Sequence, residues 1–261
     1  MNSNPLELEP LANTGTGPLY RQVKRELQRL IESGRCRPGQ MLPNETTIAE
    51  ALQVSIGTLR RAVDELVHEH VLVRRQGKGT FVALHNNDRF FFHFFHIEPR
   101  SDPQVTDGLQ SHQYPVVECM GFEKDRAGEI EAAVLRIKTG DPVFRIDNRL
   151  SLDDRAVVHD HITISALLFR GLTEKRLLDR PSTIYSLYQA EFGITVLRAQ
   201  ERARAAATDR STARILGVNV GLPVIEVHRV ALTFGDKPVE YRVSTINTQH
   251  HDYVSVLSKT L

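Results

Sequence analysis

The sequence predicts an α+β protein with two domains: a small helical domain that ends in a β-hairpin, and a larger domain around a largely antiparallel sheet. Two observations lead to this prediction. Apolar residues recur at helical spacing near the start of the chain, whereas later segments read as consecutive strands with few helices between them. A length of 261 residues fits one large domain or two of ordinary size.

Three helices are expected at the start of the chain. The first spans residues 18–33, where a proline suits the first position and Gly34 follows the last. A short second helix covers residues 45–52. Ser55 then suits the N-cap of a third helix over residues 56–69. Each helix carries an apolar stripe that predicts burial against the other two.

Strand-like runs follow the third helix. Residues 71–73 and 80–82 flank the glycine-containing segment 76–79, a pattern typical of a β-hairpin. Helix, loop, short helix, tight turn, longer helix and hairpin together form the layout of a winged helix-turn-helix.

Composition divides the chain into four parts. We expect a disordered arm at residues 1–15, the winged helix-turn-helix at 16–83, a polar linker at 84–89 and the sheet domain at 90–258. Although the net charge of the whole chain is only +1, residues 16–83 hold 11 Lys and Arg against 7 Asp and Glu. A cationic front domain favours an anionic partner such as nucleic acid.

The candidate DNA-binding residues gather at the polar start of the third helix and at the tip of the hairpin. Arginine pairs bidentately with guanine in the major groove, and short hydroxyls and cations reach phosphates or base edges. Taken one by one, such residues are as common on an ordinary solvated helix face or turn as they are at a DNA interface. The candidates are Ser55, Thr58, Arg60, Arg61, Arg75, Gln76, Gly77 and Lys78.

Several classes of protein are disfavoured. No apolar run approaches the ~18 residues of a membrane helix, and the start of the chain does not read as a signal peptide. The two cysteines, Cys36 and Cys119, cannot build a disulfide framework. An enzyme with an appended basic domain is disfavoured because the sequence contains no recognisable catalytic motif. We expect a cytoplasmic protein that is not an enzyme, has no membrane partner and needs no cofactor.

The chain contains eleven histidines, so the alternative function is that of a metal-responsive DNA-binding regulator with a histidine-based site. His159 and His161 would point to the same face of a strand over residues 157–164 and could share an ion. No spacing among the histidines provides a full ligand set. The neighbouring Asp153 and Asp154 are expected in a hairpin turn, where aspartate is common for conformational reasons.

The front domain also carries motifs of a known family. Three stretches closely resemble the GntR family of bacterial transcription regulators: Pro18-Leu19-Tyr20, Leu42-Pro43-Asn44-Glu45 and the wing Arg74–Val82. The resemblance implies a homodimer that binds double-stranded, palindromic operator DNA through Ser55, Thr58, Arg60 and Gly77. Thr46 and Ile56 stand where arginine is frequent in the family, which predicts a different operator sequence.

The sheet domain resembles the UTRA domain that GntR regulators of the HutC subfamily carry. The matching motifs are Thr183-Ile184-Tyr185, Gly221-Leu222-Pro223-Val224 and Pro238-Val239-Glu240-Tyr241. The resemblance implies a chorismate-lyase-like α+β fold without catalysis. It also implies a bound small-molecule effector, anionic or a sugar phosphate, that changes the affinity for DNA.

Arginines, hydroxyls and carboxylates would suit such an effector. The positions that match the family pocket are Ser111, Arg145, Arg149, Asp160, Thr183 and Glu240. Asp160 stands where glutamate is usual, and Ser151 is an alternative match for the second family arginine. As a structural alternative, Arg145 and Arg149 could simply pair across strands with Asp147 or Asp160.

Overall fold

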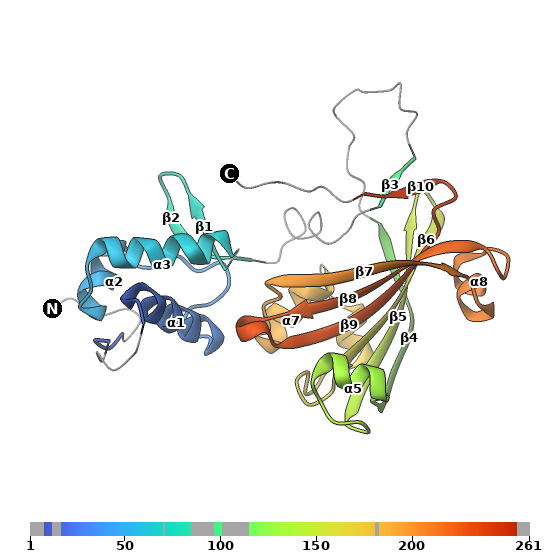
Figure 1. Ribbon diagram of the computed structural model, residues 1–261, viewed down its shortest axis with the longest axis horizontal. Coiled ribbons are helices and arrows are strands. Elements are labelled where there is room, and N and C mark those ends of the chain that lie inside the picture. Colours follow the sequence, from blue (N-terminus) through green and yellow to red (C-terminus); the bar gives the residue numbers. More distant parts are fainter. Residues whose placement is uncertain are drawn as a thin grey trace. The chain divides into compact units, whose positions relative to one another are not determined.

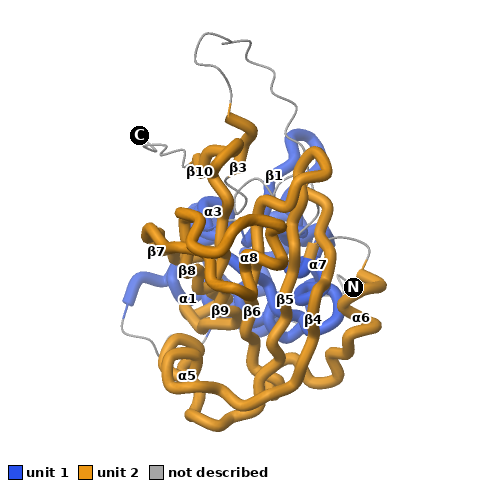
Figure 2. The backbone as a smooth tube through the Cα atoms, turned by 90° about the vertical axis from the view of Figure 1, so that its right-hand side faces the viewer, with its two compact units in different colours: residues 1–85, 184–197 blue, residues 86–183, 198–261 orange. Residues whose placement is uncertain are grey.

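The computed structural model describes residues 8–11, 17–69, 71–84, 97–100, 115–180 and 183–254. The chain divides into two compact units (Figure 2). Unit 1 comprises residues 1–85 and 184–197, and unit 2 comprises residues 86–183 and 198–261. Within the described residues, no helix is both long and apolar enough to cross a membrane.

The start of unit 1 folds as the predicted winged helix-turn-helix (Figure 1). Its elements are α1 (Leu19–Glu32), α2 (Glu45–Leu52), α3 (Ile56–His68), β1 (Leu72–Arg75) and β2 (Gly79–Val82). The apolar stripes of the three helices form its core: Leu27, Ile48, Leu59 and Leu66 are each at most 2% exposed.

Local hydrogen bonds fix the helix starts and the turn. The Asn44 carboxamide oxygen accepts from the Thr47 N–H at 2.7 Å, and the Ser55 hydroxyl accepts from the Thr58 N–H at 3.2 Å. Gln53 ends α2 in the left-handed region with a φ of 53°, which makes the connection to α3 short. The predicted N-cap at Ser55 is confirmed.

The wing is an antiparallel hairpin that pairs Leu72 with Val82 and Arg75 with Gly79. Gly77 at its tip has a φ of 69°, and no atom would lie within 4 Å of an added Cβ. The helix α7 (Ile184–Phe192) also belongs to unit 1, where the Gln189 side chain donates to the Ala83 carbonyl at 3.2 Å.

The predicted arm and linker lie largely outside the described residues. Within the arm, residues 8–11 are described. Leu8 is buried, and the Leu11 N–H donates to the Leu52 carbonyl at 3.4 Å. This short stretch therefore lies against the helical core of unit 1.

Unit 2 is built on a six-stranded sheet in the order β4-β5-β6-β9-β8-β7, with all neighbours antiparallel. The strands are β4 (Val116–Arg126), β5 (Pro142–Leu152), β6 (Arg155–Ser165), β7 (Arg198–Ala207), β8 (Pro223–Leu232) and β9 (Pro238–Ile246). The predicted α+β class with an antiparallel sheet is confirmed. Asp153 and Asp154 form the predicted turn between β5 and β6, both with positive φ.

Short elements complete unit 2. They are α5 (Glu129–Leu135), α6 (Glu174–Leu178), α8 (Arg210–Leu216), the single-turn η1 (Phe234–Asp236), and a separate pair of strands, β3 (Ile97–Pro99) and β10 (His251–Tyr253). The strand predicted over residues 90–97 lies outside the described residues except for its last residue, which opens β3.

Alternation along the strands gives the sheet two faces. On β6, Asp160 points to one side and its neighbours His159 and His161 to the other. We name these sides the Asp160 face and the His159 face. The His159 face carries α5 and α8: the Glu131 carboxylate of α5 bonds Thr163, and Thr212 of α8 lies 3.4 Å from the His159 ring.

Candidate DNA-binding and effector-binding sites

The polar start of α3 is held by its own cap. The hydroxyls of Ser55 and Thr58 lie 2.8 Å apart, and Ser55 also caps the helix. A helix N-terminus with exposed hydroxyls and N–H groups is well suited to a phosphate. The two residues thus have a structural role in the free protein, and their contact with DNA stays a prediction.

The two arginines of α3 have different surroundings. The Arg60 side chain is 61% exposed, and its Nε donates to the Glu45 carboxylate at 2.7 Å. The Arg61 guanidinium lies over the Tyr20 ring of α1, 4.0 Å from the ring centroid, which is a cation–π geometry. Both arginines are exposed, but their partners differ: Arg60 pairs with Glu45 of α2, whereas Arg61 helps to hold α3 on α1.

The wing tip presents the other candidates. Gln76, Gly77 and Lys78 are exposed, and the Arg75 guanidinium lies 4.9 Å from the centroid of the Phe81 ring. Because Gly77 has no side chain and a left-handed backbone, the tip is narrow, with cationic groups on both sides of it.

Two of the effector candidates meet on the Asp160 face. Arg242 joins them: its Nη1 donates to Asp160 at 2.9 Å, and its Nε donates to Glu240 at 3.0 Å. Glu240 has no exposed surface, and the Asp160 side chain is 4% exposed. The Ser244 hydroxyl donates to the second Asp160 oxygen at 2.5 Å. We call these four residues with Asn148 the buried polar cluster.

Asn148 completes this cluster from the neighbouring strand. It lies directly opposite Asp160 in the β5–β6 register and is 3% exposed. Its carboxamide oxygen has no hydrogen-bond partner within the described part of the chain. A buried acceptor without a partner is unfavourable, so this oxygen is suited to a donor on a ligand.

The other two arginine candidates lie on the opposite side of the sheet. Arg145 and Arg149 share the His159 face with Asp147. Arg145 pairs with Glu131 at 3.1 Å and also with Asp125, and Arg149 pairs with Glu118 at 2.5 Å. The structural alternative of pairing with Asp147 or Asp160 is thus not what the structure shows.

The last two effector candidates, Ser111 and Thr183, are not part of the buried polar cluster. Ser111 lies outside the described residues, and Thr183 is a half-buried residue directly before α7. Sequence reasoning missed Asn148, Arg242 and Ser244. The signal was present for Arg242 and Ser244, because they share the parity of Glu240 along β9 and therefore its face.

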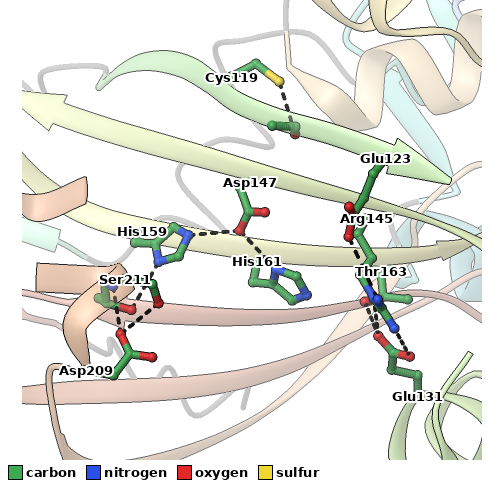
Figure 3. A network of polar contacts seen from close by, with 12 residues as sticks. Cys119, Glu123, Glu131, Arg145, Asp147, His159, His161, Thr163, Asp209 and Ser211 are labelled. Carbon is green, nitrogen blue, oxygen red and sulfur yellow. Dashed lines mark hydrogen bonds and ion pairs between the residues drawn. The ribbon is translucent and has the colours of Figure 1, made fainter. Parts of the chain in front are cut away.

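A second polar network lies on the His159 face (Figure 3). One oxygen of Asp147 bonds both His159 Nε2 and His161 Nδ1, each at 2.9 Å. The two histidines share a face, as predicted. Within the described residues, however, no group of three His, Cys, Asp or Glu side chains could hold a metal ion. The metal-responsive alternative therefore gains no support there.

The network shifts the pKa values of His161 and Asp147. The hydrogen bond to Asp147 raises the pKa of His161. Burial alone would raise the pKa of the Asp147 carboxyl, but the hydrogen bonds with His159 and His161 outweigh it and hold that pKa well below its usual range. The protonated imidazole and the carboxylate therefore stabilise one another.

This network predicts a pH-dependent stability of unit 2. A raised histidine pKa stabilises the fold fully below the unfolded value of about 6.5, and the stabilisation is lost as pH rises through the folded pKa. From pH 6 to pH 8, we expect the melting temperature of the wild type to fall more than the melting temperature of the Asp147→Asn variant. Differential scanning calorimetry at both pH values measures this, and parallel pH profiles of the two proteins would contradict it.

Two family models match the chain. The model described as "UTRA domain" matches residues 110–252, more than half of the chain, and "Bacterial regulatory proteins, gntR family" matches residues 19–82. The chain belongs to the gntR family and carries a UTRA domain. The family resemblance noted from the sequence is thereby confirmed.

The relatives of this GntR regulator include named transcription regulators. It is 26% identical to the HTH-type transcriptional repressor NagR of Bacillus subtilis over 93% of this chain and 96% of that protein. It is 33% identical to the histidine utilization repressor of Klebsiella aerogenes over 49% of this chain and 50% of that protein.

A solved structure shares the fold of its larger domain. The ligand-binding domain of a GntR-family transcriptional regulator from Bordetella bronchiseptica matches with a TM-score of 0.57 and 29% identity, over 63% of this chain and 98% of that domain. The predicted function, a ligand-responsive DNA-binding transcription regulator, is confirmed by these findings together with the family models.

Proposed function

We propose that this GntR regulator is a homodimeric repressor that releases a palindromic operator when a small metabolite binds to its UTRA domain. The observation that carries the proposal is the combination of two features on one chain. The winged helix-turn-helix presents Arg60 and a cationic wing tip, and the UTRA domain holds a buried polar cluster with an unpaired acceptor.

DNA recognition follows from the first feature. The exposed guanidinium of Arg60 suits a guanine edge in the major groove, and the wing tip around Gly77 suits the backbone or the minor groove. Two copies related by a two-fold axis would read half-sites one helical turn apart, roughly 34–36 Å. The names of these relatives, each a repressor, support repression as the sign of the response.

Effector binding follows from the second feature. In the buried polar cluster, the carboxylates of Asp160 and Glu240 outnumber the single guanidinium of Arg242, and Asn148 offers an unpaired oxygen. Hydroxyl or amino groups of a metabolite can donate hydrogen bonds to these acceptors. An anionic effector such as a sugar phosphate would therefore place its donor groups here and its anion against other residues of the domain.

The two features are coupled by a shift between two arrangements of the dimer. The effector would favour an arrangement in which the two DNA-binding domains no longer match the half-site spacing, at a coupling free energy of about 1–3 kcal/mol. In this account the regulator acts in the cytoplasm and performs no catalysis itself.

A ligand panel tests the proposal. We expect one class of compound among sugar phosphates and amino-acid catabolites to raise the melting temperature of the full chain with concentration, because a ligand of the native state stabilises it. The same compound should release the operator in a binding assay. Stabilisation by divalent metals alone would contradict the proposal and favour a metal-responsive regulator.

A further inference from the structure

We propose that Glu45 is a specificity-determining positioning residue for DNA recognition. Its carboxylate holds an arginine of α3 and an arginine of the wing in one fixed arrangement. The inference rests on the proposed role of Arg60 in reading the operator, and it adds a residue that would not itself need to touch a base.

The geometry links three elements of unit 1. Glu45 is the first residue of α2, and its two oxygens accept from different arginines. One oxygen accepts from Arg60 Nε of α3 at 2.7 Å, and the other lies 3.4 Å from Arg74 Nη2 of β1. A single carboxylate thus contacts both DNA-facing parts of the winged helix-turn-helix.

A second carboxylate closes the network. Arg74 Nη1 donates to Asp64 of α3 at 2.5 Å, and Asp64 lies one helical turn beyond Arg60. The order Arg60, Glu45, Arg74, Asp64 alternates in charge and begins and ends on the same helix. Movement of the wing strand relative to α3 would break at least one of these contacts.

The atoms involved suit positioning. Glu45 bonds Arg60 through Nε, which leaves the two Nη groups, the pair that suits the O6 and N7 acceptors of guanine. The carboxylate is 29% exposed, whereas the Arg60 and Arg74 side chains are 61% and 45% exposed. The two arginine side chains are thus more exposed than the glutamate that orients them.

Stability alone is a poor reason for such a network. Ion pairs between exposed side chains contribute little to folding, because water screens the charges and both side chains lose conformational freedom. An acidic group near the DNA backbone also reduces the attraction for phosphate. Glu45 therefore weakens sequence-independent binding. We infer that its benefit is to hold the Arg60 side chain in one orientation, which favours the specific sequence.

The experiment compares Glu45→Ala with a matched control, Glu50→Ala. Glu50 is exposed at the other end of α2 and carries the same charge. A duplex is first selected from a random-sequence pool with the full-length wild type. Fluorescence anisotropy then gives the Kd for that duplex and for an unrelated duplex of equal length, at several salt concentrations.

We expect Glu45→Ala to bind the unrelated duplex several-fold more tightly and to lower the ratio of selected to unrelated affinity about tenfold, the discrimination that one arginine–guanine pair supplies. Glu50→Ala should leave that ratio unchanged. Glu45→Asp keeps the charge but shortens the side chain by one methylene group, so it should lower the ratio without raising the affinity for the unrelated duplex.

Three results would overturn the proposal: an unchanged ratio in Glu45→Ala, an equal change in Glu50→Ala, or a wild-type ratio in Glu45→Asp. Melting curves of each variant show that the comparison is between folded proteins. If the wild type enriched no duplex at all, the proposed function would fail together with this inference. Enrichment without an effect of Glu45 would overturn the inference alone.

Discussion

Replacing Arg60 with alanine is expected to abolish specific operator binding while leaving the fold intact. The side chain is 61% exposed, and its ion pair with Glu45 is a surface interaction, so the stability of the domain should change little. Each bidentate arginine–guanine contact contributes about 1–3 kcal/mol to discrimination, and the homodimer that we propose would lose two of them. The affinity for the operator should therefore fall toward that for unrelated DNA.

The measurement is a footprint, together with a Kd, on the duplex selected by the wild type. Arg29→Ala is the matched control. Arg29 is 77% exposed in the last turn of α1, and its replacement removes the same charge from a helix other than α3. We expect the control to retain the wild-type footprint. A wild-type footprint from Arg60→Ala would remove Arg60 from the reading residues.

Glu240→Ala is expected to lower the free energy of unfolding of the UTRA domain strongly and to abolish the effector response. Glu240 has no exposed surface, and its carboxylate is bound by Arg242, whose side chain is 11% exposed. Removing one partner of a buried ion pair leaves the other charge poorly compensated and costs about 3–5 kcal/mol. Because Asp160 still pairs with Arg242, we expect the lower end of that range.

Chemical denaturation of the full chain measures the stability loss, with Glu129→Ala as a control on an exposed carboxylate of α5. The control should change the free energy of unfolding by less than about 0.5 kcal/mol. Glu240→Gln keeps the shape and one acceptor, so it tests the effector response in a better-folded protein. Below its melting temperature each variant should still bind the operator. A normal effector response from Glu240→Gln would argue against a role of this carboxylate in the site.

The winged helix-turn-helix could be predicted closely because local signals determine it. The structure begins and ends α2 at the predicted residues, Glu45 and Leu52. Asn44 and Ser55 cap α2 and α3, and glycine at position 77 sets the hairpin tip. Each of these features depends on residues within a few positions of one another, and a single sequence carries that information.

The arrangement of the candidate effector site could be predicted only in part. Arg145, Arg149, Asp160 and Glu240 all lie on the expected strands, but the two arginines face away from the two carboxylates. A strand shows which of its own residues share a face. Its pairing with the next strand depends on the turn at Asp153 and on the irregularity after Leu150.

Ion-pair partners that are far apart in the sequence could not be predicted either, because their meeting also depends on how the elements pack. The pairs Arg242–Asp160 and Arg60–Glu45 join residues that are 82 and 15 positions apart, and no periodicity predicts which charges meet. The short elements α6 and β10 were also missed, since five and three residues carry too little pattern to be recognised.

Titration of a stabilising metabolite into the preformed protein–operator complex tests the central claim most directly. Fluorescence anisotropy of the labelled operator reports its release. The account predicts that the compound which raises the melting temperature of the UTRA domain also lowers operator affinity, by about 5–150-fold. A complex whose affinity stays the same at saturating concentrations of that compound would contradict the coupling between the two domains.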